Sequence, residues 1–172
     1  ANNGNGDRDI FVYMGGEQVV PEDVTHVRID KSVEVIEDHA FEYNEHLVQV
    51  DTHDRIRRVG KRAFFGCKSL RSIDLRSVVE IGVMAFDGCE NLTGVKFGDK
   101  LETIGEWVFD GCTSLERLKL PSIITVRSNA IQFCKALSSI ELSERLESIQ
   151  PGAFYDCDRL QRIAIPLKRG LF

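Results

Sequence analysis

Five cysteines are the residues of this sequence whose type and spacing most readily suggest chemistry. They stand 22 or 23 residues apart, at Cys67, Cys89, Cys112, Cys134 and Cys157. A zinc site needs four ligands that converge on one ion, usually in pairs close in sequence, whereas this even spacing predicts one thiol in each unit of a repeating structure. We therefore expect structural thiols in a core, with redox or metal chemistry as the less favoured alternative. Stacked units would allow a disulfide, but an odd number of thiols favours a reducing intracellular compartment.

Histidine and aspartate side chains are the second candidate for chemistry. The four histidines lie in the first third of the chain, at His26, His39, His46 and His53. None of them forms the i, i+4 pair of a zinc protease. Alternation along the predicted strands would bring His53 close to three aspartates, Asp30, Asp51 and Asp74. Such a cluster could hold a cation or supply an acid and a base, but a solvated face with cross-strand pairs explains it at least as well.

Several functional classes are disfavoured by motif and composition. The sequence contains no nucleophile elbow, Walker loop, dinucleotide fingerprint or kinase signature, so we expect no enzymatic activity, cofactor or metal. Its 22 basic and 27 acidic residues give a net charge of -5, which argues against nucleic acid as the principal partner. Apolar residues make up 42% of the chain without a run long enough to cross a bilayer, so we expect no membrane insertion.

The even spacing of the cysteines extends to the whole chain, which repeats one pattern six times. The clearest copy is Val59 to Leu75, VGKRAFFGCKSLRSIDL. Equivalent copies begin at Ile36, Val59, Ile81, Ile104, Val126 and Ile149. One apolar column contains Phe41, Phe64, Phe86, Phe109, Ile131 and Phe154, and another contains only leucine. A fixed period of this length is typical of a solenoid whose repeated columns form the core.

Each unit combines two kinds of spacing. The tail, Leu-x-x-Ile-x-Leu, alternates with period two and predicts a short strand in a parallel sheet on one face. The Ala-Phe-x-x-Cys part has spacings nearer three and four, which favours one helical turn before the strand. A second extended piece, such as residues 101–104, should connect the units.

The repeats divide the chain into four parts. Residues 1–9 are read as a flexible leader, and residues 10–35 as an N-terminal hairpin cap with a half-repeat. The hairpin is expected over Ile10 to Val20, because Gly15 and Gly16 suit a tight turn. Six repeats of 22–23 residues follow over 36–166, and residues 167–172 form a C-terminal tail.

The repeated columns resemble the BspA-type leucine-rich repeat, with its pattern Ile-Gly-x-x-Ala-Phe-x-x-Cys-x-x-Leu-x-x-Ile-x-Leu. The resemblance covers roughly Val24 to Pro166. The departures are Glu37, Asn44, Val108, Arg127 and Ile131. The resemblance implies a mainly β, right-handed leucine-rich repeat solenoid with a parallel sheet on one face. It also implies adhesion or protein binding, and it supplies no catalytic residue.

Three surfaces are candidates for a protein partner. The first is the sheet face, whose charged residues are Arg28, Asp51, Asp74, Lys96, Arg117, Lys119 and Glu141. Its acids and bases are grouped along the row, which suits a charged partner, although a mixed solvated face is the alternative. The second is the spot formed by Met84 and Trp107 with Val83, unless Trp107 folds back as local packing. The third is the open C-terminal edge, at Arg162 to Ile165, through which the chain could assemble.

These observations predict a non-catalytic protein–protein interaction module of leucine-rich repeat type. The alternative is a structural subunit of a larger assembly, or a fragment of a longer repeat protein, with no soluble ligand. A surface adhesion protein is a more distant alternative.

Overall fold

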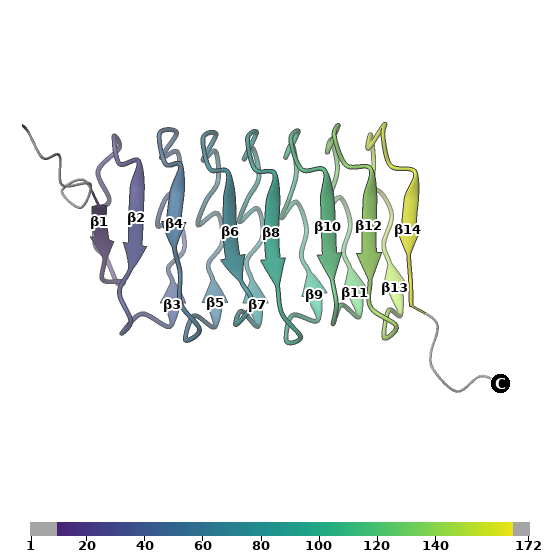
Figure 1. Cartoon of the computed structure of the whole chain (residues 1–172), viewed down its shortest axis with the longest axis horizontal. Helices are drawn as coiled ribbons and strands as arrows, with labels where there is room; N and C mark the ends of the chain where they lie inside the picture. Colours follow the sequence, from purple (N-terminus) through teal and green to yellow (C-terminus); the bar gives the residue numbers. More distant parts are fainter. Residues whose placement is uncertain (1–9, 167–172) are drawn as a thin grey trace, which may run out of the picture.

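A computed structural model describes residues 10–166, which form one parallel-strand solenoid with three walls (Figure 1). The expected leader, 1–9, and tail, 167–172, lie outside the described residues. The front wall consists of β1 (Ile10–Tyr13), β2 (His26–Ile29), β4 (Gln49–Asp51), β6 (Ser72–Leu75), β8 (Gly94–Phe97), β10 (Arg117–Leu120), β12 (Ser139–Leu142) and β14 (Arg162–Ala164). The back wall consists of β3 (Val35–Ile36), β5 (Arg58–Val59), β7 (Glu80–Ile81), β9 (Thr103–Ile104), β11 (Thr125–Val126) and β13 (Ser148–Ile149).

The apolar columns of the sequence form the core between these walls. On the front strands, buried and exposed residues alternate, as in β10, because successive side chains of a strand point to opposite faces. The phenylalanine column stacks along the axis, with ring centroids 5.0 Å apart for Phe41 and Phe64 and 5.6 Å apart for Phe86 and Phe109. The predicted repeat solenoid with a parallel face is therefore confirmed.

The third wall, which we call the turn wall, joins the back strand of each repeat to its front strand. It comprises residues 38–47, 61–70, 83–92, 106–115, 128–137 and 151–160. The expected helical turn is not what these segments form, and the described part of the chain contains no helix. Each segment is a series of β-turns, for example with Ala40 N bonded to Glu37 O and Asn44 N bonded to Phe41 O.

Two positions of each β-turn series have left-handed backbone. One carries His39, Arg62, Met84, Trp107, Asn129 and Gly152, and the other carries Tyr43, Gly66, Gly88, Gly111, Phe133 and Asp156. Positive φ at the third residue is the geometry of a type II turn, which the spacing of apolar residues does not reveal. Other N–H groups of the series, such as those of His39, Phe41 and Tyr43, point along the solenoid and bond to carbonyl groups of the next repeat.

The five cysteines have a structural role in the turn wall. Each thiol donates to the main-chain carbonyl at the phenylalanine column of the preceding repeat, with distances of 2.9–3.2 Å. Asn44 replaces cysteine in the first repeat, and its side chain donates instead to Pro21 O, at 2.9 Å. All five thiols are free, and only Cys157 is not fully buried. The column therefore supplies one inter-repeat hydrogen bond per layer.

The predicted N-terminal hairpin is wrong. Gly15 and Gly16 do form a turn with positive φ, but β1 pairs in parallel with β2, and Val19 is 86% exposed. Tyr13 is fully buried, and its ring lies 5.0 Å from that of Phe41. Residues 10–13 therefore extend the front wall and the ring stack, because stacking on the first repeat buries apolar surface that an isolated hairpin would leave in water.

The front and back walls are interrupted at the same place, between the third and fourth repeats. Within residues 10–166, no strand pairing joins β8 to β10 or β7 to β9. The turn wall is continuous there, with Phe86 N bonded to Val108 O at 2.9 Å and Gly88 N bonded to Asp110 O at 2.8 Å. The two halves of the solenoid are therefore held together by the turn wall and the core.

Thiol reactivity tests the structural role of the cysteines. Burial raises the pKa of the Cys67 and Cys112 thiols, so they have little reactive thiolate at neutral pH. We expect a maleimide to label Cys157 in the native protein, and the other four thiols only after unfolding. Peptide mapping by mass spectrometry identifies the labelled residue, and Cys157→Ser should abolish native labelling. Rapid native labelling of Cys89 or Cys112 would contradict the structure.

Candidate binding surfaces

The N-terminal half of the front wall carries the predicted acidic residues, and they are internally bonded. Asp51 accepts hydrogen bonds from His26 and Gln49, both at 2.8 Å, and lies 3.7 Å from the guanidinium of Arg28. Burial raises the pKa of Asp51, but these hydrogen bonds outweigh it and hold the pKa below its usual value. Arg28 and Asp51 therefore neutralise each other on neighbouring strands.

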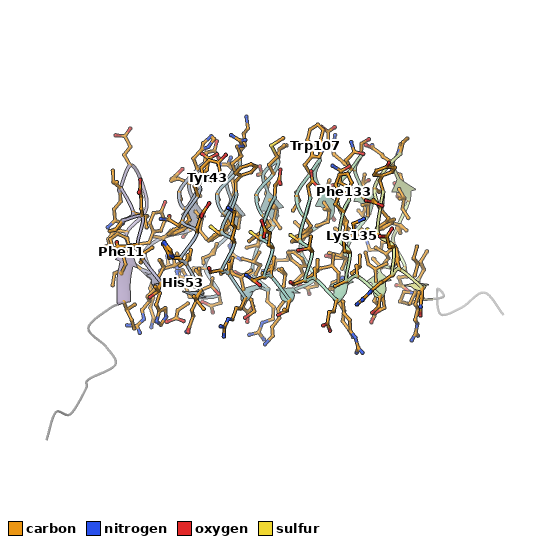
Figure 2. The ribbon with its side chains drawn as sticks, turned by 90° about the horizontal axis from the view of Figure 1, so that it is seen from above. Phe11, Tyr43, His53, Trp107, Phe133 and Lys135 are labelled. Carbon is orange, nitrogen blue, oxygen red and sulfur yellow. The ribbon has the colours of Figure 1, made fainter. Side chains whose placement is uncertain are left out.

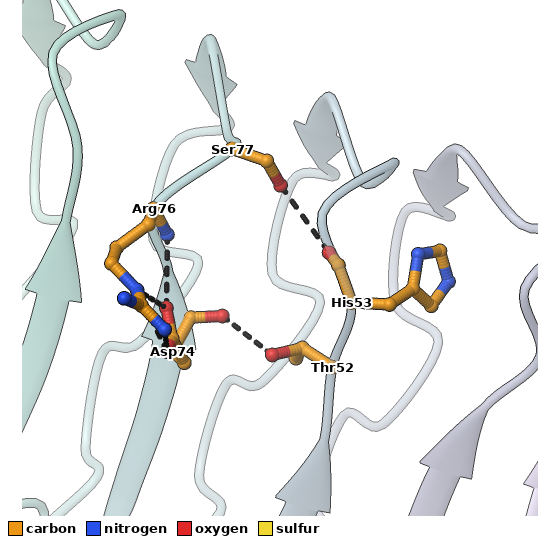
Figure 3. Close-up of polar contacts among 5 residues, drawn as sticks. All are labelled: Thr52, His53, Asp74, Arg76 and Ser77. Atoms are coloured by element: carbon orange, nitrogen blue, oxygen red, sulfur yellow. Dashed lines mark hydrogen bonds and ion pairs between the residues drawn. The ribbon is translucent and has the colours of Figure 1, made fainter.

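Asp74, on β6, also accepts hydrogen bonds from a neighbouring side chain (Figure 3). The Arg76 side chain donates to both carboxylate oxygens of Asp74, at 2.7–3.0 Å, and lowers its pKa. Thr52 donates to the main-chain oxygen of Asp74, and Ser77 donates to that of His53. These contacts border a cavity of about 640 Å³ whose lining is mainly polar and charged. Small-molecule pockets are mainly apolar, so this one is a poor substrate site.

The histidine and aspartate residues considered from sequence as an acid–base or cation cluster are hydrogen-bonded to other groups. Asp30 accepts from the Ser32 hydroxyl at 2.6 Å, and Nε2 of His53 donates to the main-chain oxygen of Asp30 at 2.9 Å. Asp51 and Asp74 already accept the hydrogen bonds described above. Over residues 10–166, no three His, Cys, Asp or Glu side chains are placed to hold a metal ion.

The C-terminal half of the front wall is predominantly basic. Its exposed cations are Lys96 on β8, Arg117 and Lys119 on β10, and Arg162 on β14. Lys119 pairs with Glu141 at 3.0 Å, whereas Lys96 and Arg117 form no ion pair with any described residue. Small residues surround them, and an ideal Cβ at Gly94 would meet no atom within 4 Å. This half of the wall therefore presents accessible positive charge on a shallow surface.

The predicted spot on the turn wall is half-buried. Met84 and Trp107 have intermediate exposure, and neighbouring Val83 is 36% exposed. Sequence reasoning missed two aromatic pairs in the repeats on either side, Tyr43 with Phe65 and Phe133 with Tyr155, whose ring centroids are 5.2 and 5.6 Å apart. The available signal was that aromatic residues replace glycine at the left-handed position in the first and fifth repeats.

Two carboxylates lie in the middle of the turn wall on adjacent repeats. Burial, and secondarily the negative charge of Asp110, raises the pKa of Asp87 to about 6, and the charge of Arg62 opposes this shift. Asp110 accepts a hydrogen bond from Gln132 at 2.8 Å. The charge of Arg62 therefore offsets only part of the cost of ionising Asp87.

Comparison with known proteins identifies the repeat. A family model described as "BspA type Leucine rich repeat region (6 copies)" matches residues 21–97 and 72–169. A search of curated protein sequences finds no match. None of the described residues forms a helix long and apolar enough to span a bilayer.

Solved structures of bacterial leucine-rich repeat proteins share the fold. The protein TpLRR of T. pallidum is 28% identical with a TM-score of 0.80, and the alignment covers 93% of this chain and 76% of that one. A leucine-rich repeat protein of Eubacterium ventriosum is 24% identical with a TM-score of 0.68, covering 88% of this chain and 37% of the other. A leucine rich cell surface protein of Faecalibacterium prausnitzii is 20% identical with a TM-score of 0.52, covering 86% and 61%. The chain thus spans less than two thirds of the last two proteins.

The raised pKa of Asp87 predicts a pH-dependent stability effect. Because its pKa is higher in the folded state, ionised Asp87 destabilises the protein increasingly as the pH rises from about 4 through about 6. Asp87→Asn should therefore increase the free energy of unfolding by about 1 kcal/mol at pH 7.5, and the gain should vanish near pH 4. Urea unfolding at both pH values measures it, with the exposed Glu90→Gln as control. A less stable Asn variant at pH 7.5 would show that ionised Asp87 is stabilising.

Proposed function

The chain belongs to the BspA-type leucine-rich repeat family, and from this we propose that it is a non-catalytic protein-binding module whose partner docks on the front wall. The observation that carries this proposal is the basic half of that wall, β8 to β14. Four exposed cations stand there with one carboxylate among them, Glu141. The chemistry best suited to this surface is an acidic segment of another protein, attracted by complementary charge.

The distribution of polar contacts supports recognition over catalysis. The acidic half of the front wall satisfies its own charges, as Asp51 and Asp74 show, and it leaves no poised acid or base. The basic half of the wall does not satisfy its own charges: Arg117 forms no ion pair with a described residue, and Lys96 has only the longer-range attraction of Asp74 on the neighbouring strand. A shallow cavity of about 230 Å³ between β10, β12 and β14 would receive individual side chains. Variable side chains on the strands of a fixed scaffold are how repeat arrays recognise partners.

Adhesion at a cell surface is a narrower version of this proposal. One solved relative in fold is described as a cell surface protein, and its 20% identity with this chain shows a common fold alone. If this chain has the same location, its partner is extracellular, and the same basic half-wall would bind it.

Charge reversal on the front wall tests the proposal. Lys96→Glu with Lys119→Glu should weaken binding of a fluorescein-labelled decapeptide of alternating glutamate and serine at least tenfold, because both cations contribute to attraction. Fluorescence anisotropy at 50 mM salt measures the affinity. Lys61→Glu with Arg127→Glu, two exposed residues next to back strands, is the control with the same charge change. Equal binding by wild type and the Lys96/Lys119 variant would refute this site.

The thermal stability of the variant separates recognition from folding. Both lysines are exposed, and the added like-charge neighbours, Asp74 and Glu141, should cost about 1 kcal/mol or less in total. A melting temperature that falls by more than a few degrees would mean that reduced binding reflects unfolding.

The competing proposal is an architectural role, which the last repeat favours. There Ile149, Ile163 and Ile165 are 43–49% exposed, although most residues of their columns are buried in earlier repeats. Phe154 and Leu160 are only partly buried for the same reason. This layer would be covered by another repeat-like layer, such as that of a second copy.

Light scattering after size exclusion tests the architectural role. Apolar contact through the last layer predicts a dimer whose population rises with concentration, and Ile163→Lys should make the protein monomeric. Ile163 is already half-exposed, so its replacement should leave the fold intact, which circular dichroism would verify. A monomer at all concentrations would exclude self-association through this layer.

A further inference from the structure

The aromatic side chains outside the core are concentrated on one wall. In residues 10–166 they are Tyr43, Phe65, Trp107, Phe133 and Tyr155, and all belong to the turn wall. Figure 2 shows three of these, Tyr43, Trp107 and Phe133, along the same side of the solenoid. The outward-facing positions of the front wall carry no aromatic residue. Tyrosine, tryptophan, phenylalanine and methionine are the residue types enriched in the centres of protein interfaces.

Three of these aromatic residues have a left-handed backbone conformation, which is unfavourable for bulky side chains. Tyr43, Trp107 and Phe133 have φ of 60°, 55° and 55°. Bulky side chains rarely occur there, and three repeats have glycine at the position of Tyr43 and Phe133. The aromatic residues are thus placed on this wall against the local preference of the backbone. Strained positions of this kind tend to occur at binding sites.

The charge of the turn wall indicates what binds there. Its two central segments, residues 83–92 and 106–115, contain four carboxylates but neither lysine nor arginine: Asp87, Glu90, Glu106 and Asp110. In the flanking repeats, Arg62 pairs with Glu42 and Lys68 pairs with Glu45. The centre therefore carries four carboxylates and no lysine or arginine of its own, beside the half-buried Met84 and Trp107, and the nearby cations Arg62 and Lys68 already pair with other carboxylates.

We propose that the turn wall is a second docking surface, which takes a lysine- or arginine-rich segment of a partner protein. Cationic heads would lie against Asp87 and Asp110, while their aliphatic stems would cover Met84 and Trp107. The aromatic pairs at either end would bound the segment and favour cations through their ring faces. Arg62 already uses one such face, with Cζ 4.2 Å from the centre of the Phe65 ring.

The length of the surface sets the length of the segment. Tyr43 and Phe133 lie four repeats apart, or about 19 Å at about 4.8 Å per layer. An extended peptide of about six residues spans that distance at about 3.3 Å per residue. The centre of the turn wall is acidic, whereas the C-terminal half of the front wall is basic. The two sites would therefore select partners of opposite charge.

A cationic peptide tests the proposal directly. The probe is a fluorescein-labelled decapeptide of alternating lysine and serine, and the same peptide with glutamate in place of lysine is the charge control. The wild type should bind the lysine peptide saturably by anisotropy, and the Lys96→Glu, Lys119→Glu variant, which lacks the front-wall cations, should bind the glutamate peptide at least tenfold more weakly than the lysine peptide. The unlabelled lysine peptide should also shift the emission of Trp107, the one tryptophan of the chain.

Paired variants locate the binding site. Asp87→Asn with Asp110→Asn should weaken the lysine peptide at least tenfold, whereas Glu144→Gln with Glu147→Gln, which remove two exposed carboxylates outside the turn wall, should change it less than twofold. Lys96→Glu with Lys119→Glu should not weaken it, so this test is independent of the front wall. Thermal melting would confirm that the Asn variant is folded. The absence of saturable binding, an unchanged Trp107 emission, or equal loss in both carboxylate pairs would overturn the proposal.

Discussion

A ladder of main-chain hydrogen bonds in the turn wall is the interaction on which the rest of the solenoid depends. In the first five repeats, the N–H of the residue in the phenylalanine column bonds to the carbonyl of the alanine column in the next repeat, at 2.7–2.9 Å, so that five bonds link the six repeats. Beneath it lie the stacked rings and the thiol–carbonyl bonds. The ladder spans the junction where both strand walls are interrupted. It therefore fixes the spacing of the layers along the described chain.

Because the ladder and the core hold the fold, the exposed residues are free to form two different surfaces on one scaffold. The ladder residues point inward or along the axis, so the residues between them tolerate variation without loss of the core. On the front wall that variation has produced an internally neutralised half and a basic half. On the turn wall it has produced an acidic centre between aromatic pairs. Opposite charges on separate walls disfavour a single partner for both and favour two distinct contacts.

The sequence predicted the parts of the structure that repeat and missed those that depend on a single repeat. The apolar columns and the front strands followed from period and alternation, and the cysteines were correctly placed in the core. The hairpin was wrong because Gly15 and Gly16 define only a local turn, whereas stacking of Tyr13 on Phe41 decides the path of the chain. The left-handed backbone was hidden because its positions carry side chains as different as Arg62, Trp107 and Gly152. The sequence pattern does not differ at the junction of the third and fourth repeats in a way that would predict the interrupted strand pairing.

Native-state hydrogen exchange at three glycine amides tests the central role of the turn wall. Gly88 N bonds across the interrupted junction to Asp110 O, at 2.8 Å, and Gly82 N bonds to Val59 O within an intact back wall, at 2.8 Å. In the described structure, Gly105 N has no equivalent bond to Ile81. Amide exchange followed by NMR should show Gly88 and Gly82 protected to a similar degree and Gly105 exchanging much faster. Exchange at Gly88 as fast as at Gly105 would contradict the account, because the turn wall would then not hold the two halves together.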